Sequence, residues 1–152
     1  MPNIFVTFIA SFLIWGLFAG LAILWVIDGK IKKEQAMHAF YAGLVSWAAA
    51  TMIKSFVPTS RPFMTNGEIP LTLTIPVDGS FPSAHTAVAF AIAVSIYLHN
   101  KGYGSIFLGT AIVIGIGRIL SNVHYPTDVL GGVIIGIIAS LVLKRLHFPL
   151  DD

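Results

Sequence analysis

Basic, imidazole and hydroxyl side chains gather at three places in this sequence, with the chemistry needed to bind and transfer a phosphoryl group. They are Lys54 and Arg61, then Ser83 and His85, then Arg118, His124 and Asp128. The transition state of phosphoryl transfer carries negative charge on three equatorial oxygens, so stabilising that charge is most of the catalytic task. Lys54, Arg61 and Arg118 supply three cations, and an arginine can donate forked hydrogen bonds to phosphate. Ser83 begins an apolar stretch, so its hydroxyl and nearby backbone N–H groups can face an anion at a helix N-terminus.

The elements that must position these side chains are five apolar stretches, at about residues 4–27, 39–53, 83–98, 106–119 and 129–143. Hydrophobic residues make up 56% of the chain and charged residues 11%, against about 25% charged residues in a typical soluble domain. A membrane-spanning helix needs roughly 20 residues, so semi-polar flanking residues must complete the shorter stretches. We predict an all-α membrane bundle of about five transmembrane helices, forming one domain over residues 1–152. The absence of cysteine excludes disulfides and thiolate catalysis.

The basic residues predict how the bundle lies in the membrane. Six of the nine fall in alternate hydrophilic gaps and at the C-terminal end: Lys30, Lys32, Lys33, Lys101, Lys144 and Arg145. The remaining three are Lys54, Arg61 and Arg118, the candidate phosphate ligands. Cytoplasmic segments of membrane proteins carry the excess of Lys and Arg. The N-terminus is therefore predicted outside, the C-terminus inside, and all candidate site residues at the outer face of a cell inner (cytoplasmic) membrane.

Small residues recur at four-residue spacing in the first and last apolar stretches. Gly16 is followed by Gly20, and Gly132 by Gly136 and Ser140. Such positions let membrane helices approach closely. We predict packing within one bundle, with a dimer interface as the alternative.

The spacing of the polar residues matches a family pattern of three motifs. Lys54, six residues and then Arg61-Pro62 form the first, and Pro82-Ser83-Ala84-His85 the second. Gly117-Arg118, five residues, His124, three residues and Asp128 form the third. The sequence thus resembles the type 2 phosphatidic acid phosphatase (PAP2) family, over about half of the chain. Members often have six helices, so this chain resembles one that lacks an N-terminal helix.

Together with this resemblance, the residues suggest a division of roles. A neutral His124 would attack phosphorus and form a phosphohistidine, while Asp128 accepts a hydrogen bond from the other ring nitrogen. Pro126 makes a continuous helix between these two residues unfavourable, so His124 is expected in a loop and Asp128 at the start of the last helix. His85 would donate a proton to the leaving oxygen and then activate water. The cations replace the metal ions of other phosphatases, so neither a metal nor a cofactor is expected.

Two positions depart from the family pattern. Ala84 stands where glycine is usual, and Gly117 where serine is usual. Neither change removes a charged or proton-transfer group, so we expect altered rate or selectivity. Residues 63–81, between the first two motifs, are expected to be non-helical. They are predicted to form a short hairpin or interfacial flap at the substrate entrance, with a plain solvent loop as the alternative.

The predicted function is a metal-independent phosphatase acting on a membrane lipid, through a phosphohistidine, at the outer face. The resemblance implies undecaprenyl diphosphate, phosphatidylglycerol phosphate, phosphatidic acid or lipid A 1-phosphate as the substrate. The alternatives are a small transporter, since intramembrane charges also mark ion pathways, and a phospholipid-binding protein without turnover. The partners are the lipid and the bilayer, and nothing in the sequence indicates nucleic acid. Oligomeric state is left open.

Overall fold

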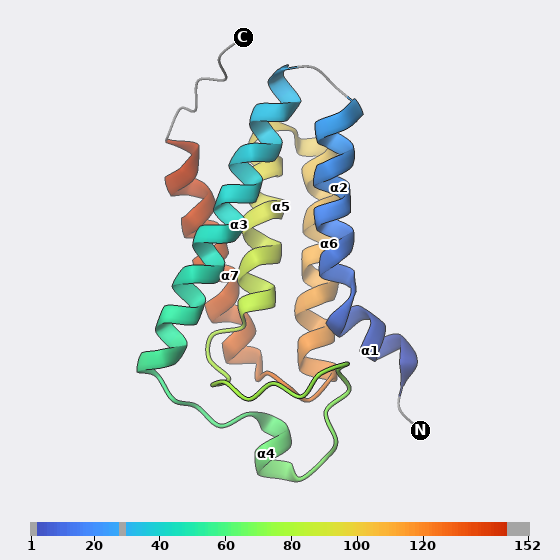
Figure 1. Ribbon diagram of the computed structural model, residues 1–152, viewed down its shortest axis with the longest axis vertical. Helices are drawn as coiled ribbons and strands as arrows, with labels where there is room; N and C mark the ends of the chain where they lie inside the picture. The colour runs from blue at the N-terminus through green and yellow to red at the C-terminus, as the bar shows by residue number, and fades with distance from the viewer. Residues whose placement is uncertain (1–2, 28–29, 146–152) are drawn as a thin grey trace.

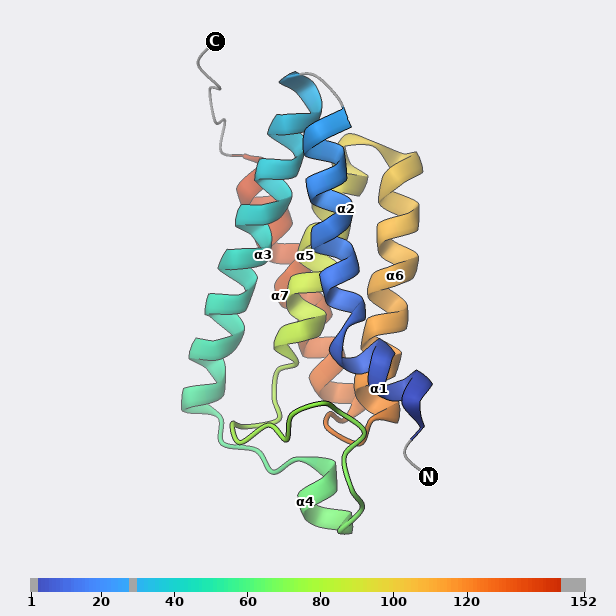
Figure 2. The same cartoon turned by 45° about the vertical axis from the view of Figure 1, so that its right-hand side comes forward.

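The structure, a computed structural model, describes residues 3–27 and 30–145, and this part of the chain is helical without strands. Its helices are α1 (Ile4–Ser11), α2 (Leu13–Ile27), α3 (Lys30–Phe56), α4 (Pro62–Asn66), α5 (Ala84–His99), α6 (Lys101–Leu120) and α7 (Pro126–Lys144). The five longest run side by side, with α4 and its loop at one end (Figures 1 and 2). The predicted all-α class is confirmed. Residues 146–152 of the predicted domain lie outside the described residues.

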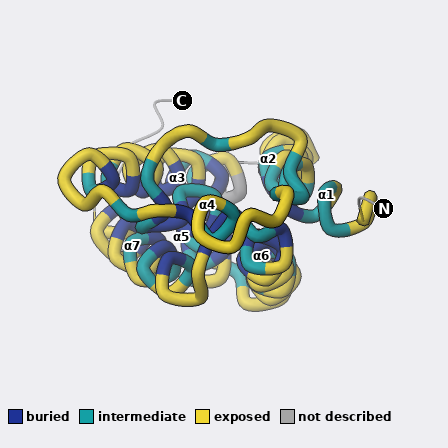
Figure 3. Tube along the Cα trace, turned by 90° about the horizontal axis from the view of Figure 1, so that it is seen from below, coloured by how far each residue is buried: buried dark blue, intermediate teal, exposed yellow. Residues whose placement is uncertain are grey.

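Helix α5 forms the centre of the bundle and packs against α3, α6 and α7. Its sequence alternates alanine with larger apolar residues on every face, and a helix that is apolar all round is expected to be buried. Ala87, Ala89, Ala91 and Ala93 are fully buried there. Viewed along the bundle axis, buried residues gather around α5 and exposed ones form the outer rim (Figure 3). The outer rim is apolar, as lipid contact requires, with Trp15, Leu44 and Ile134 exposed.

The lengths of the helices fit a membrane protein. Lys33–Phe56, α6 and α7 are each long and apolar enough to cross a bilayer, and α1 with α2 form a fourth candidate span bent by 47°. Helix α5 has 16 residues, about 24 Å at 1.5 Å per residue, which is short of a hydrocarbon core of roughly 30 Å. Because its neighbours cover it, α5 does not need to reach both membrane surfaces. The predicted count of five spans stays a prediction.

The helices extend further than the apolar stretches predict. The second stretch was expected to begin near Ala39, but α3 begins at Lys30 and ends at Phe56. Lys, Glu, Gln, Ala and Met are all good helix formers, so the polar residues before Ala39 continue the helix. Hydropathy detects the part of a helix that lies in lipid, whereas hydrogen bonding continues into the polar ends.

The first apolar stretch is divided near Phe12 rather than continuous. The Ala10 carbonyl, in the last turn of α1, accepts a hydrogen bond from Nη1 of Arg118 at 2.8 Å. A side chain that inserts into the backbone hydrogen-bond ladder is a recognised cause of a helix kink. Arg118 comes from α6, far away in sequence, so the bend is a long-range effect.

The segment between the first two motifs crosses the lower ends of the helices. The Leu71 N–H donates to the Ser121 carbonyl at 2.9 Å, and the Leu73 N–H to the Ser11 hydroxyl at 3.1 Å. The predicted hairpin is therefore wrong, because the segment bonds to the loop after α6 and the end of α1. Its first residues, Phe63–Asn66, belong to α4, so they are helical rather than irregular.

Gly20, Gly132 and Gly136 pack inside the bundle, as predicted, whereas Gly16 is exposed and meets only its own helix. A Cβ atom at Gly132 would lie 2.6 Å from the Ser83 carbonyl oxygen, and one at Gly136 would lie 2.6 Å from that of Ala87. Ser140 extends this row by donating to the Ala91 carbonyl at 2.7 Å. Helix α7 can therefore approach α5 closely, which fixes the distance between the second and third motifs.

Candidate active site

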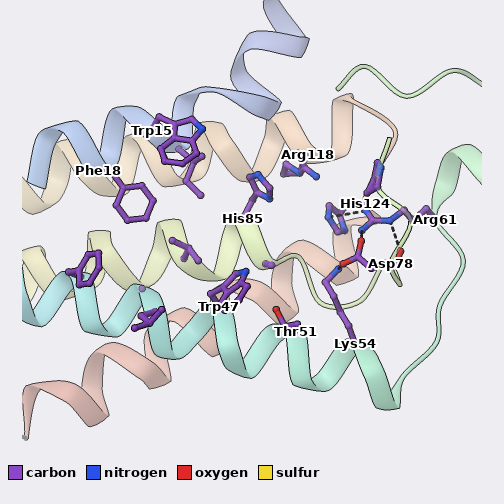
Figure 4. Close-up of a pocket in the computed structure, with 17 residues that line it drawn as sticks. Trp15, Phe18, Trp47, Thr51, Lys54, Arg61, Asp78, His85, Arg118 and His124 are labelled. Atoms are coloured by element: carbon purple, nitrogen blue, oxygen red, sulfur yellow. Dashed lines mark hydrogen bonds and ion pairs between the residues drawn. The ribbon is translucent and has the colours of Figure 1, made fainter. Parts of the chain in front are cut away.

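The three motifs meet at the lower end of the bundle, around a cavity of about 470 Å³. Lys54 comes from the end of α3, Arg61 from the start of α4, and His85 from the first turn of α5. Arg118 lies in the last turn of α6, and His124 in the loop before α7. All five line the cavity, and Figure 4 shows them converging on it. Residues separated by more than 60 positions in sequence thus share one site.

Backbone carbonyls and one carboxylate hold Lys54 and Arg61 in place. Lys54 Nζ donates to the Gly79 carbonyl at 2.6 Å. Arg61 donates from Nε to the Asp78 carbonyl at 2.9 Å and from Nη1 to the Val123 carbonyl at 2.8 Å. The carboxylate of Asp78 pairs with both cations, at 3.3 Å from Lys54 Nζ and 2.7 Å from Arg61 Nη2. Charged donors are therefore fixed at the rim of the cavity.

Arg118 and His85 form the opposite wall. Arg118 is 5% exposed, and within the described residues its Nε has no hydrogen-bond partner. A buried charged donor without an acceptor is costly, so it marks a place where a ligand would supply one. His85 points into the cavity beside Arg118 (Figure 4). An anion in the cavity would meet donors from both walls.

His124 and Asp128 have the arrangement expected of a nucleophile and its orienting carboxylate. His124 precedes α7, which begins at Pro126, and Asp128 lies in the first turn of that helix, as predicted. His124 Nδ1 lies 3.4 Å from Asp128 Oδ2, close enough for an ion pair but without hydrogen-bond geometry, and Nδ1 has no other hydrogen-bond partner within the described residues. The same oxygen accepts a bond from the Tyr125 N–H at 2.7 Å and one from the Ser80 hydroxyl. Asp128 therefore accepts a backbone hydrogen bond at the start of α7 and also places its carboxylate next to Nδ1 of His124.

The neighbours of His124 also indicate its tautomer. Arg61 Nη1 lies 3.3 Å from His124 Nε2. Because a guanidinium can only donate hydrogen bonds, Nε2 must be the unprotonated nitrogen in this contact. The ring proton then resides on Nδ1, on the side of Asp128. In this structure the Nε2 lone pair accepts the Arg61 bond at the edge of the cavity, so Arg61 must transfer that bond to a phosphate oxygen before Nε2 can attack phosphorus.

The surroundings keep His124 neutral. Burial lowers the pKa of His124 to about 4, and although Asp128 opposes this shift, Arg118 and Arg61 add to it. His124 is therefore uncharged at neutral pH, and Nε2 keeps a lone pair that can act as a nucleophile once Arg61 binds phosphate instead.

Ser83, unlike the other predicted phosphate ligands, is not among the residues that line the cavity. Its side chain is fully buried, and its hydroxyl accepts bonds from the Thr86 hydroxyl at 2.9 Å and the Thr86 N–H at 3.4 Å. Ser83 thus caps α5, and the cavity wall is formed by the next residues, Ala84 and His85. Its contact with phosphate stays a prediction.

Two functional side chains escape prediction from the motifs: Asp78, which pairs with the cations, and Ser80, which donates to Asp128. Both lie in the irregular segment between the first two motifs, where no periodicity reveals orientation. One signal was available for Asp78. Two clustered cations need a counter-charge, and this segment offers only Glu68 and Asp78.

The upper part of the cavity is apolar and lies between α2 and α3. Trp15 and Phe18 of α2 lie across it from Trp47 of α3 (Figure 4). Phe40 and Leu44 of α3 also line this cavity. A second cavity of about 420 Å³ shares Phe18 and Phe40 with the first and continues between the same helices to Trp25. All three tryptophans of the chain, Trp15, Trp25 and Trp47, therefore line these cavities. The site joins a cationic end to an apolar groove.

Comparison with known proteins agrees with this geometry. The PAP2 superfamily model matches residues 35–151. The chain is 32% identical over 141 residues to the bacitracin transport permease protein BcrC of Bacillus licheniformis, covering 93% of this chain and 70% of that protein. It is 26% identical over 125 residues to undecaprenyl-diphosphatase BcrC of Bacillus subtilis (strain 168), covering 82% and 64%. The crystal structure of Aquifex aeolicus LpxE matches with a TM-score of 0.78 and 30% identity, covering 94% and 85%.

Proposed function

Because the chain belongs to the PAP2 superfamily, a family of membrane lipid phosphatases, we propose that it removes the terminal phosphate of a single-chain polyprenyl diphosphate. The observation that carries this proposal is the juxtaposition of the His124 lone pair, three cations and an apolar groove in one cavity. The B. subtilis relative is named as an undecaprenyl-diphosphatase, which favours undecaprenyl diphosphate among the candidate lipids.

The cations bind the terminal phosphate. Arg61, Arg118 and Lys54 surround the cationic end of the cavity, and Arg118 Nε is free to donate to a phosphate oxygen. Charge-assisted bonds of this kind are roughly twice as strong as neutral ones. Their catalytic value is greatest in a site that excludes water, because the dipoles and charges are already in place when charge develops.

The first chemical step transfers the phosphoryl group to the enzyme. His124 Nε2 attacks phosphorus, an N–P bond forms, and the bond between phosphorus and the bridging oxygen breaks. The departing polyprenyl phosphate takes its electron pair and receives a proton from His85, which must be protonated when substrate is bound. Burial and the neighbouring cations otherwise disfavour the imidazolium, and the negative charge of the bound diphosphate offsets them. Asp128 accepts the Nδ1–H bond and stabilises the positive charge that develops on the ring.

The second step releases phosphate. His85, now neutral, removes a proton from water, and the water oxygen attacks phosphorus while the N–P bond breaks. Nε2 of His124 regains its lone pair, and inorganic phosphate leaves. All proton transfers and charge stabilisation are assigned to this chain's own side chains, so we expect the reaction to proceed in chelator.

The apolar groove supports a lipid whose tail stays in the bilayer. Trp15, Phe40 and Trp47 are exposed on the outside of the bundle, so the groove opens sideways between α2 and α3. A hydrocarbon chain can lie in it while the headgroup reaches the cations. A groove bounded by two helices suits one chain better than the several chains of lipid A. A transport path would instead need polar residues along its length, and here they gather at one end.

The orientation of the site is also part of the proposal. Helix α3 begins at Lys30, α6 at Lys101 and α7 ends at Lys144, and these ends lie together opposite α4 and the site (Figure 1). The positive-inside rule then places the site at the outer face of the cytoplasmic membrane. Substrate would reach it from the outer leaflet.

The pKa of His124 predicts the acid limb of the pH profile. Since this pKa is about 4, His124 is neutral above that pH and loses its lone pair below it. We expect kcat/KM to rise as the pH increases through about 4 and His124 to impose no further loss towards neutral pH. The terminal phosphate also ionises at about pH 6, so the titration of the His124 ring is followed by NMR without substrate. A His124 pKa near the ordinary value of about 6.5 would contradict this account. Size-exclusion elution at each pH controls for unfolding.

The proposed activity is tested by phosphate release from four lipids in detergent with EDTA present. They are undecaprenyl diphosphate, phosphatidylglycerol phosphate, phosphatidic acid and lipid A 1-phosphate. We expect kcat/KM to be highest for the diphosphate and unchanged by the chelator. His99→Ala, at the opposite end of the bundle, is the matched control and should behave as wild type. Activity that is lost in EDTA and restored by magnesium, or a clear preference for lipid A, would contradict the proposal.

A further inference from the structure

The carboxylate of Asp78 occupies a position between two phosphate-binding cations. Its Oδ1 lies 2.7 Å from Arg61 Nη2, and its Oδ2 lies 3.3 Å from Lys54 Nζ. It lines the same cavity as Arg118 and His124, and Figure 4 shows it between the two cations. Each carboxylate oxygen thus meets a different cation, as two oxygens of one phosphate group would.

The need for an anion here follows from the burial of the cations. The side chains of Lys54 and Arg61 are 6% and 2% exposed. Two buried like charges without a counter-charge are strongly unfavourable. The carbonyls of Gly79 and Val123 orient these donors, but carbonyls bring no net charge. Among the described residues, Asp78 is the group that offsets half of this charge when no phosphate is present.

The carboxylate can also leave. The side chain of Asp78 is 56% exposed, in contrast to its two partners. The backbone of Asp78 is held separately, because its carbonyl accepts a bond from Arg61 Nε at 2.9 Å. A rotation about the side-chain bonds would move the carboxylate into solvent while the main chain and both cations stay in place.

We propose that Asp78 is an internal stand-in for phosphate, which a substrate must displace and which sets a charge threshold for binding. This inference rests on the proposed function. A terminal phosphate monoester carries up to two negative charges, so it can replace the single charge of a carboxylate with a net electrostatic gain. A phosphodiester carries one negative charge and gains little. The bulk phospholipids of the bilayer are phosphodiesters, so Asp78 keeps them out of a cationic site that opens towards the membrane.

The electrostatics of Asp78 agree with this role. Burial alone would raise its pKa, but Lys54 and Arg61 outweigh that effect and hold the pKa below its ordinary value. The carboxylate therefore stays charged at neutral pH and competes with any anion that enters the cavity.

The test measures binding without turnover, so it is independent of whether the proposed reaction takes place. Trp15 and Trp47 line the cavity, and their fluorescence reports occupancy. The full chain in detergent is titrated with inorganic phosphate and, separately, with dioleoyl phosphatidylglycerol in mixed micelles. Asp78→Asn and Asp78→Ser are compared with wild type, and Glu68→Gln serves as the control because it removes an equal charge from the same segment.

We expect both Asp78 variants to bind phosphatidylglycerol about tenfold more tightly or better, with at least a similar fold gain for phosphate because the same displacement cost is removed, while Glu68→Gln binds both as wild type does. Unchanged or weaker binding of the phosphodiester in folded Asp78 variants would overturn the proposal. Failure of both variants to fold, even when purified with phosphate, would overturn it too, because a group that the fold requires cannot be displaced by substrate. An equal gain in affinity in Glu68→Gln would mean that the effect comes from the net charge of the segment and not from the position of Asp78, and it would also overturn the proposal.

Discussion

Replacement of His124 by alanine is expected to lower kcat by about 10⁴-fold or more. The substitution removes the lone pair that faces the cavity, and no other described side chain has a neutral nitrogen placed between Arg61 and Asp128. His85 also lines the cavity, but it extends from α5 beside Arg118 and lacks a carboxylate partner among the interactions of the described residues. Phosphate release from undecaprenyl diphosphate measures the effect.

The loss of rate should be confined to the chemical step, and phosphate binding should change little. Lys54, Arg61 and Arg118 remain in the variant, so the dissociation constant for inorganic phosphate should change by only a few fold. His99→Ala is again the matched control for a histidine-to-alanine change elsewhere in the bundle. A His124→Ala protein that elutes as folded protein and retains a tenth or more of the wild-type rate would contradict the assignment of the nucleophile.

Asp128→Asn is expected to lower kcat by about 10³- to 10⁴-fold with little change in KM. The carboxylate oxygen that faces His124 Nδ1 also accepts bonds from Tyr125 and Ser80. An amide in its place can present N–H towards Nδ1, which would move the ring proton to Nε2 and remove the attacking lone pair. The comparison of kcat with KM across the two proteins measures this effect.

The alternative role of Asp128 is structural, and the same variant separates the two. The amide nitrogen that faces Nδ1 replaces the oxygen that also accepts the Tyr125 N–H bond, so the variant loses that bond at the start of α7 at a cost of about 0.5–2 kcal/mol. Thermal unfolding in detergent checks this. A tenfold or smaller loss of kcat would mean that Asp128 serves the helix start alone.

The sequence predicts the helices and the motif residues well because both depend on local patterns. Apolar stretches reveal the helix interiors, and Pro126 separates the loop at His124 from the helix that carries Asp128. Charge and imidazole chemistry at fixed spacing then identifies the residues that line the cavity. The spaced glycines indicate close helix packing, which the contacts of Gly132 and Gly136 with α5 confirm.

What the sequence does not predict depends on contacts between distant segments. The bend near Phe12 follows from the hydrogen bond that Arg118 donates to the Ala10 carbonyl. Nothing in the sequence around either residue predicts that the two meet. Asp78 lies 24 positions after Lys54, in a segment without regular secondary structure, so no periodicity says which way its side chain points. The amphiphilic cavity forms only because α2 and α3 pack side by side. From the sequence alone, tryptophans on two separate helices indicate a membrane interface as well as they indicate a shared cavity.

Trapping of the phosphoenzyme tests the central claim most directly. Enzyme mixed with undecaprenyl diphosphate labelled with ³²P in its terminal phosphate is quenched in alkali within one turnover and digested for mass spectrometry. The account predicts a label that is stable in alkali and labile in acid, located on His124, and absent from His124→Ala. Turnover of the labelled lipid with no phosphoenzyme, or with the label on a residue other than His124, would contradict it.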